Sequence, residues 1–257
     1  MHSSRAGGRA ARFAAQGAVI LLVGFGAVGL PQTSPAPTPA GNQPAGNQSP
    51  ASLPTPPPAP AHPFLILIDP AHGGTESGAV LNPTLLEKDV TLAFARKLRQ
   101  ELGARGISVQ LLREADGTFS PDQRAVAANA VRAALYVAIH ATSQGTGMRI
   151  YTAALALGED DRGPFVSWQE AQSASLARSR SVQQQMTASI QKTGFPLRAL
   201  SAPLRPLNNL LIPALAIEIA PTTGDVSQLA SADYQQMVSA AVANSIASIR
   251  GRLESTP

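Results

Sequence analysis

The stretch "FLILIDPAHGG", residues 64–74, runs five apolar residues into an acid, a turn and a histidine, and closes with two glycines. A short uninterrupted apolar run of this kind is typical of a strand that is covered on both faces, as in a parallel sheet. Open α/β sheets bind their ligands at the carboxyl ends of such strands. His72 is therefore predicted to lie at the functional edge of a sheet.

Apolar runs and helical patterns alternate after this stretch. Further strands are predicted at "ISVQLL" (107–112), "LYVAIH" (135–140), "MRIYTAA" (148–154) and "ALAIEIA" (214–220). Helices are predicted at 85–103, from Ser120 as the N-cap with Pro121 at the first helical position, at 171–192 and at 232–250. The alternation predicts a single α/β domain over residues 64–252, with a mostly parallel central sheet flanked by helices and a short tail at 253–257.

The chain before this domain has the composition of an exported protein. Residues 1–12 are basic, and residues 13–30, "FAAQGAVILLVGFGAVGL", are apolar and uncharged. Residues 1–30 are predicted to be a signal peptide, with a retained N-terminal membrane anchor as the alternative. Residues 31–63 hold 12 of the 22 prolines and no charge, which predicts a disordered Pro-rich linker. The expected location is the periplasm or the cell envelope.

Charge and composition exclude several classes of function. Three of the 20 basic residues precede residue 64, which leaves 17 basic and 16 acidic side chains in the domain. A nearly neutral domain with 4% aromatic residues is not expected to bind nucleic acid. The chain has no cysteine, which excludes a cysteine nucleophile, a thiolate metal site and disulfides.

Three titratable residues fall at or near the ends of predicted strands. His72 follows the first strand, His140 closes "LYVAIH", and Glu218 lies inside "ALAIEIA". An ionised carboxylate in a buried apolar run costs several kcal/mol unless it is paired or binds a cation. Glu218 is therefore expected to have a partner.

A fourth candidate, Glu87, follows from helical periodicity. Val90, Phe94 and Leu98 come 3, 7 and 11 residues after it, which places Glu87 on the inward-facing stripe of its helix. The neighbouring Lys88 falls off this stripe, as does residue 89, and both are expected to be ordinary solvated charges.

Two imidazoles and one carboxylate form a typical catalytic zinc set with a fourth position for water. A further carboxylate is then needed as general base, and Glu218 is available for that role. Structural roles remain open at this point, since no short metal-binding motif has these spacings. His72 suits a turn, His140 a satisfied core position, Glu87 a helix N-terminus, and Glu218 an ion pair, for example with Arg205.

Four segments resemble one known family, the zinc-dependent N-acetylmuramoyl-L-alanine amidases of the amidase_3 type. They are "IDPAHGG", "LLEKDVTLAFARKL", "VAIHAT" and "LIPALAIEIA", in that order, and the resemblance extends from residue 64 to about residue 250. It implies a Zn²⁺ cofactor held by His72, Glu87 and His140, with Glu218 as catalytic base. It also implies hydrolysis of the amide bond between N-acetylmuramic acid and L-alanine in peptidoglycan.

The resemblance sets further expectations for individual residues. Ala71 stands where the family has glycine, so it either keeps a negative φ or is strained. Thr142 and Ser143 stand where asparagine is usual, which alters the expected substrate loop. Asp69 either orients His72 as a hydrogen-bond acceptor or caps its own turn. In "FSPDQRAVAANAV", Arg124 and the asparagine at 129 are expected to pack and to form hydrogen bonds.

Some functional questions stay open. The polar segment 158–172 is expected to be a solvated insertion, with a gate over the metal as the alternative hypothesis. The alternatives to the amidase are an inactive domain that binds wall fragments and a zinc peptidase acting elsewhere in the stem peptide. Peptidoglycan or a muropeptide is the expected partner. Targeting is left to the linker, an anchor or an unidentified activator protein.

Overall fold

The computed structural model describes residues 64–155 and 167–254. Its centre is a six-stranded sheet with the order β4-β1-β5-β8-β6-β7. The strands are β1 (Leu65–Pro70), β4 (Ser108–Leu111), β5 (Leu135–Ala141), β6 (Met148–Ala153), β7 (Leu197–Ala202) and β8 (Ala214–Ile219). The helices are α1 (Glu87–Gly103), α2 (Pro121–Ala130), α3 (Leu176–Gln191) and α4 (Ala232–Glu254). Short 3₁₀ helices are η1 (Trp168–Ser175), η2 (Leu207–Asn209) and η3 (Val226–Ala230).

The sheet is mostly parallel, as the sequence predicts. Strands β4, β1, β5 and β8 run in one direction. Strand β6 pairs antiparallel with β8, and β7 follows β6 in parallel. The antiparallel step arises because the chain turns back directly after β5, and β8 is inserted between β5 and β6.

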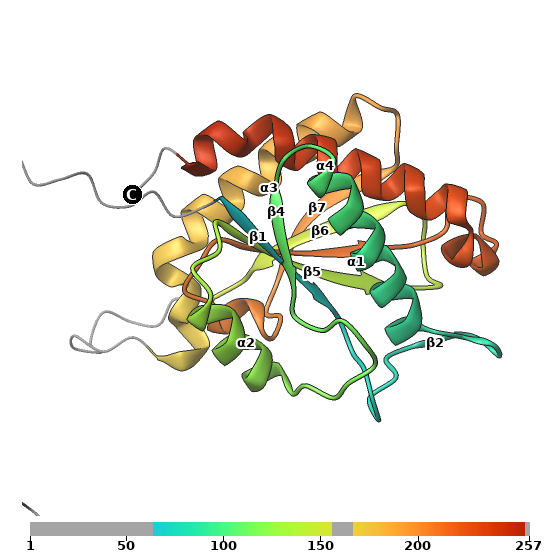
Figure 1. Cartoon of the computed structure of the whole chain (residues 1–257), viewed down its shortest axis with the longest axis horizontal. Coiled ribbons are helices and arrows are strands. Elements are labelled where there is room, and N and C mark those ends of the chain that lie inside the picture. Colours follow the sequence, from blue (N-terminus) through green and yellow to red (C-terminus); the bar gives the residue numbers. More distant parts are fainter. Residues whose placement is uncertain (1–63, 156–166, 255–257) are drawn as a thin grey trace, which may run out of the picture. The chain divides into compact units, whose positions relative to one another are not determined.

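Helices cover both faces of the sheet (Figure 1). Helices α1, α3 and α4 pack on one face, and α2 lies on the other. Side chains of β1 alternate between the two cores: Ile66 and Ile68 enter the larger one, and Leu67 enters the smaller. The stripe of Phe94 and Leu98 on α1 also packs in the larger core, so the helical periodicity is confirmed.

Several element boundaries differ from the sequence prediction. Helix α1 begins at Glu87, because residues 85–86 form strand β3 (Leu85–Leu86), which pairs with β2 (Val80–Asn82) in a hairpin. Strand β7 was not predicted, because it is a largely exposed edge strand without an apolar run. The predicted cap of α2 is confirmed: the Ser120 side chain accepts from the Gln123 N–H, and Gln123 completes a capping box.

Two buried arginines hold the carboxyl end of β1. Arg113 donates to Pro70 O at 3.0 Å and to Ala71 O at 3.2 Å. Arg124 donates to Pro70 O at 3.1 Å, to His72 O at 2.7 Å and to the Asp69 carboxylate. The carbonyl groups at the point where the chain leaves the sheet therefore have charged donors instead of water.

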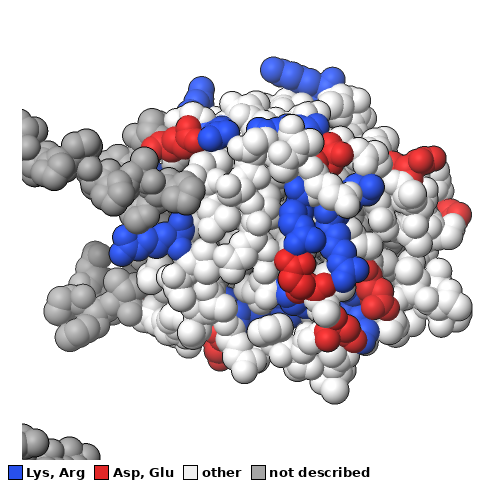
Figure 2. Space-filling view, in the orientation of Figure 1, with Lys and Arg blue, Asp and Glu red and all other residues white. Residues whose placement is uncertain are grey.

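Basic and acidic side chains lie close together over part of the surface (Figure 2). Figure 2 shows basic and acidic side chains next to one another on the face that it presents. Ion pairs with exposed partners include Arg99 with Glu114 and Lys88 with Asp116. Such exposed or half-exposed pairs contribute little to stability, typically about 0–1 kcal/mol each.

The predicted signal peptide or anchor (1–30), the linker (31–63), most of segment 158–172 and the end of the tail lie outside the described residues. Among the helices of residues 64–155 and 167–254, none is long and apolar enough to cross a membrane.

Replacing Arg124 with Met is expected to lower the free energy of unfolding by about 3 kcal/mol, because the buried Asp69 carboxylate loses its cationic partner and the His72 carbonyl loses its donor. Urea denaturation measures the change. Arg99→Met, which removes an exposed ion pair, serves as the control and should cost less than about 1 kcal/mol. A loss below about 1 kcal/mol in Arg124→Met would contradict this role.

Candidate metal centre

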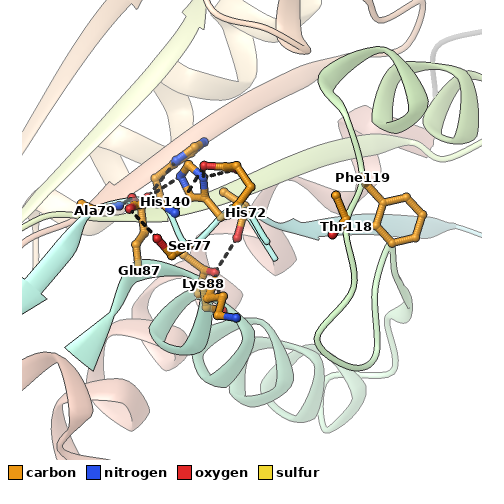
Figure 3. Close-up of polar contacts among 12 residues, drawn as sticks. His72, Ser77, Ala79, Glu87, Lys88, Thr118, Phe119 and His140 are labelled. Carbon is orange, nitrogen blue, oxygen red and sulfur yellow. Dashed lines mark hydrogen bonds and ion pairs between the residues drawn. The ribbon is translucent and has the colours of Figure 1, made fainter. Parts of the chain in front are cut away.

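Three predicted residues from three separate elements meet at one edge of the sheet. His72 follows β1, Glu87 begins α1, and His140 lies near the end of β5. The Glu87 Oε1 atom is 3.1 Å from His72 Nε2 and 3.0 Å from His140 Nδ1. One ligand atom from each residue lies within 4.8 Å of the others (Figure 3). The two imidazole rings stand edge to face, with centroids 5.3 Å apart.

The backbone strain expected near the first histidine falls on the histidine itself. Ala71 directly follows β1, and its N–H donates to Ile139 O on β5 at 3.0 Å. His72 has a φ of 63°, and no other non-glycine residue in the described ranges has a positive φ. A left-handed conformation costs about 1–3 kcal/mol at a non-glycine residue and persists where the surroundings fix it. Arg124, bound to His72 O, supplies part of that restraint.

Glu76 is a partner of His72 that the sequence reasoning missed. Its carboxylate lies 2.6 and 2.7 Å from His72 Nδ1. Backbone hydrogen bonds between Gly73 and Glu76 in both directions hold the turn closed. A hydrogen on Nδ1 leaves Nε2 as the atom available to a metal. The sequence signal for this contact is the spacing of four residues between His72 and Glu76 across a turn that contains two glycines.

The electrostatics of the cluster favour an ionised Glu87. Burial alone would raise the pKa of Glu87, but hydrogen bonds from His140, His72 and the Ala79 N–H hold that pKa well below its usual range. Burial lowers the pKa of His72, and the hydrogen bonds and charges of Glu87 and Glu76 outweigh it, so the net pKa is raised. An ionised Glu87 therefore places one negative charge between the two histidines.

Gly78 lets the backbone pass against the cluster. Its φ is +67°, and a Cβ atom there would lie 2.6 Å from His72 Cδ2 and 2.7 Å from Glu87 Oε2. Lys88, expected to be a solvated charge, instead donates to Gly74 O at 2.9 Å and to Asp116 Oδ2 at 2.7 Å. It ties the turn after His72 to the loop that follows β4.

Glu218 has a partner, but a different one from that suggested by sequence. It lies on β8 with its side chain 24% exposed, and Arg149 on β6 donates to its Oε2 at 2.5 Å. The Tyr151 hydroxyl donates to the same oxygen at 3.1 Å. Arg205 pairs with Asp122 instead. Burial lowers the pKa of Arg149, but the hydrogen bond and charge of Glu218 outweigh it, so that pKa is raised.

The remaining sequence candidates have structural contacts. Asp69 is buried, and among the described residues its carboxylate forms hydrogen bonds with Arg124 and the Tyr136 hydroxyl, and none with His72 or with its own turn. Hydrogen bonding by Arg124 is confirmed, and the Asn129 side chain bridges Asn209 O and the Leu211 N–H. The Thr142 N–H donates to Ile219 O at 2.9 Å, which continues the pairing of β5 with β8.

Comparison with known proteins gives one family. A family model described as N-acetylmuramoyl-L-alanine amidase, Amidase_3, matches residues 66–248. The N-acetylmuramoyl-L-alanine amidase AmiC of Escherichia coli O6:H1 is 41% identical over 80 residues, covering 31% of this chain and 19% of that protein. This chain spans a third or less of the length of that relative and of others with similar matches.

Solved structures agree. The amidase AmiC2 of Nostoc punctiforme superposes with a TM-score of 0.56 at 26% identity, over 74% of this chain and 98% of that one. The CwlD amidase of Clostridioides difficile, solved in complex with the GerS lipoprotein, has a TM-score of 0.53 at 21% identity, over 74% and 99%. At that identity, the likeness to CwlD concerns the fold.

Replacing Gly78 with Ala is expected to destabilise the protein more than replacing Gly106 with Ala. Both glycines have a φ of +67°, but nothing lies within 4 Å of a Cβ at Gly106. The two variants are thus matched in φ. The difference between their losses in the free energy of unfolding, expected to be about 1–3 kcal/mol, measures the clash of the new Cβ with His72 and Glu87. Urea denaturation of the metal-free variants checks it. Equal losses of stability in the two variants would mean that the His72 and Glu87 side chains move aside freely.

Proposed function

This chain belongs to the Amidase_3 family of N-acetylmuramoyl-L-alanine amidases, and we propose that it hydrolyses the amide bond between N-acetylmuramic acid and L-alanine in peptidoglycan. The observation that carries the proposal is the meeting of His72, Glu87 and His140 within 4.8 Å, with Glu218 beside His140 in strand register. The expected setting is the remodelling of the cell wall by an exported protein.

The donor set suits a zinc ion. Two imidazole nitrogens and one carboxylate oxygen are the ligands of many catalytic zinc sites that keep a fourth position for water. Glu87 is buried and its pKa is lowered, so its carboxylate is ionised and ready to bind a cation. We propose that His72, Glu87 and His140 hold Zn²⁺, which when bound lowers the pKa of water to about 7 and polarises the scissile carbonyl.

The chain's own groups supply orientation and proton transfer. Glu76 accepts from His72 Nδ1 and fixes the ring that presents Nε2. Glu218 acts as the general base: its carboxylate takes a proton from the attacking water and delivers it to the nitrogen of the leaving L-alanine. Glu87 is held by the Ala141 N–H, which donates to Glu87 Oε1 at 3.2 Å.

We propose partners and a location from the family and the sequence. The substrate is peptidoglycan or a muropeptide. The related CwlD was solved in complex with a lipoprotein, and we propose an activator protein as a second partner of this chain. We propose export to the cell envelope through residues 1–30, either as a cleaved signal or as an N-terminal anchor.

Incubation with purified muropeptides tests the reaction. The expected products are free stem peptides that begin with L-alanine, and a chelator should stop their release until Zn²⁺ is returned. Mass spectrometry identifies the products. Shortened peptides still attached to sugar would indicate a zinc peptidase instead. Binding to peptidoglycan without any product, in protein that carries stoichiometric zinc, would indicate a wall-binding domain.

A separate experiment tests the proposed roles of Glu87 as a metal ligand and of Glu218 as the general base. Glu218→Gln is expected to keep zinc and to lower kcat by about 10²–10⁴, since it removes a general base. Glu87→Gln is expected to lose zinc on dialysis, because a carboxylate ligand is gone. Glu114→Gln, an exposed residue paired with Arg99, is the control and should change neither property. Zinc content by atomic absorption and kcat on one muropeptide are measured together; loss of zinc in Glu218→Gln would contradict the assignment.

A further inference from the structure

Three strands each place one polar residue at the same level of the sheet. His140 on β5 is in register with Glu218 on β8, and Glu218 is in register with Arg149 on β6. Residues in register on neighbouring strands project from the same face. Glu218 therefore stands between a histidine of the metal cluster and a guanidinium group.

The two oxygens of Glu218 have different surroundings. Oε2 accepts from Arg149 Nη1 at 2.5 Å and from the Tyr151 hydroxyl at 3.1 Å. Within residues 64–155 and 167–254, Oε1 accepts no hydrogen bond. The terminal torsion of a glutamate is broad, so a carboxylate without such contacts exchanges its oxygens by rotation. Here, one oxygen is fixed and the other is available.

The loop after β5 is shaped around Arg149. The Gln144 carbonyl accepts from Arg149 Nη2 at 2.5 Å. Gly145 has a φ of +78°, and a Cβ atom there would lie 2.3 Å from the same nitrogen. At Gly147, a Cβ atom would lie 2.1 Å from Pro196 O, so this loop is also pressed against the start of β7. The guanidinium group is therefore held between this loop and Glu218.

We infer that Arg149 is a positioning residue for the hydrolysis proposed above: it fixes Glu218 through Oε2 and leaves Oε1 as the oxygen that accepts the proton. The inference rests on the proposed function. Oε1 takes one proton from the water as the new C–O bond forms, and the same proton passes to the amine nitrogen as the C–N bond breaks. Glu218 ends the cycle as the carboxylate that began it.

Positioning of this kind has a measurable size, because a displacement of about 1 Å costs on the order of 10²-fold in rate. Arg149→Met is expected to lower kcat by about 10²-fold, with KM and zinc content unchanged. Arg149→Lys should recover about tenfold of that loss, because an ammonium group can donate to Oε2 without holding the loop. Arg198→Met is the control, since Arg198 is exposed and lies in register with Arg149 on β7.

Tyr151→Phe removes one hydrogen bond to Oε2 and keeps the arginine, so it tests the same idea if Arg149→Met does not fold. It is expected to lower kcat severalfold with an unchanged melting temperature. The double variant of Arg149→Met with Glu218→Gln should be no slower than Glu218→Gln alone, since the arginine acts only through the glutamate.

Three results would overturn the inference while leaving the amidase activity intact. A higher KM with an unchanged kcat in Arg149→Met would assign the arginine to substrate binding. A higher kcat would mean that the ion pair restrains Glu218. Losses that add in the double variant would mean that the arginine acts elsewhere. Absence of any muropeptide hydrolysis by the zinc-loaded wild-type protein would instead count against the proposed function.

Discussion

The metal centre depends on the hydrogen bonds that the buried guanidinium groups of Arg113 and Arg124 donate to the backbone at the end of β1. His72 leaves the sheet in a left-handed conformation, and the carbonyl groups beside it point toward the interior. Without donors, each buried carbonyl would cost about 1–3 kcal/mol. Arg113 and Arg124 each offer several N–H groups in a rigid plane, which satisfies adjacent carbonyls at once. The first metal residue is therefore held in place by buried cations beneath it.

A neighbouring buried carboxylate balances the charge of one of these arginines. Asp69 neutralises Arg124 and also accepts from the Tyr136 hydroxyl, whose pKa burial and the Asp69 charge raise well above its usual value. Burial and the charge of Arg124 lower the pKa of Arg113. Asp69 therefore supports His72 indirectly: it pairs with the buried Arg124, and Arg124 donates to the His72 carbonyl.

Much of the fold could be predicted because the buried elements have a clear period. The strands β1, β5 and β8 are apolar runs, and Glu87 was located by its place on the stripe of α1. Strand β7 escaped prediction because an exposed edge strand carries no such run. The partner of Glu218 escaped it because β6 and β8 are far apart in sequence and pair only through the order of the sheet. The sequence did not predict which of Ala71 and His72 has the positive φ, because local sequence does not show which of the two residues still pairs with β5.

Because β6 runs antiparallel to β8, β6 begins at the carboxyl end of β8 and ends toward its amino end. Arg149 lies near its start, level with His140 and Glu218, whereas Tyr151 is already paired with Ala216, deeper along β8. The chain therefore leaves β6 beyond Ala153 at the edge opposite to the metal residues. The two ends of β6 thus differ in what they carry: its start holds a residue that contacts the proposed general base, and its end lies a full strand length away from the metal residues.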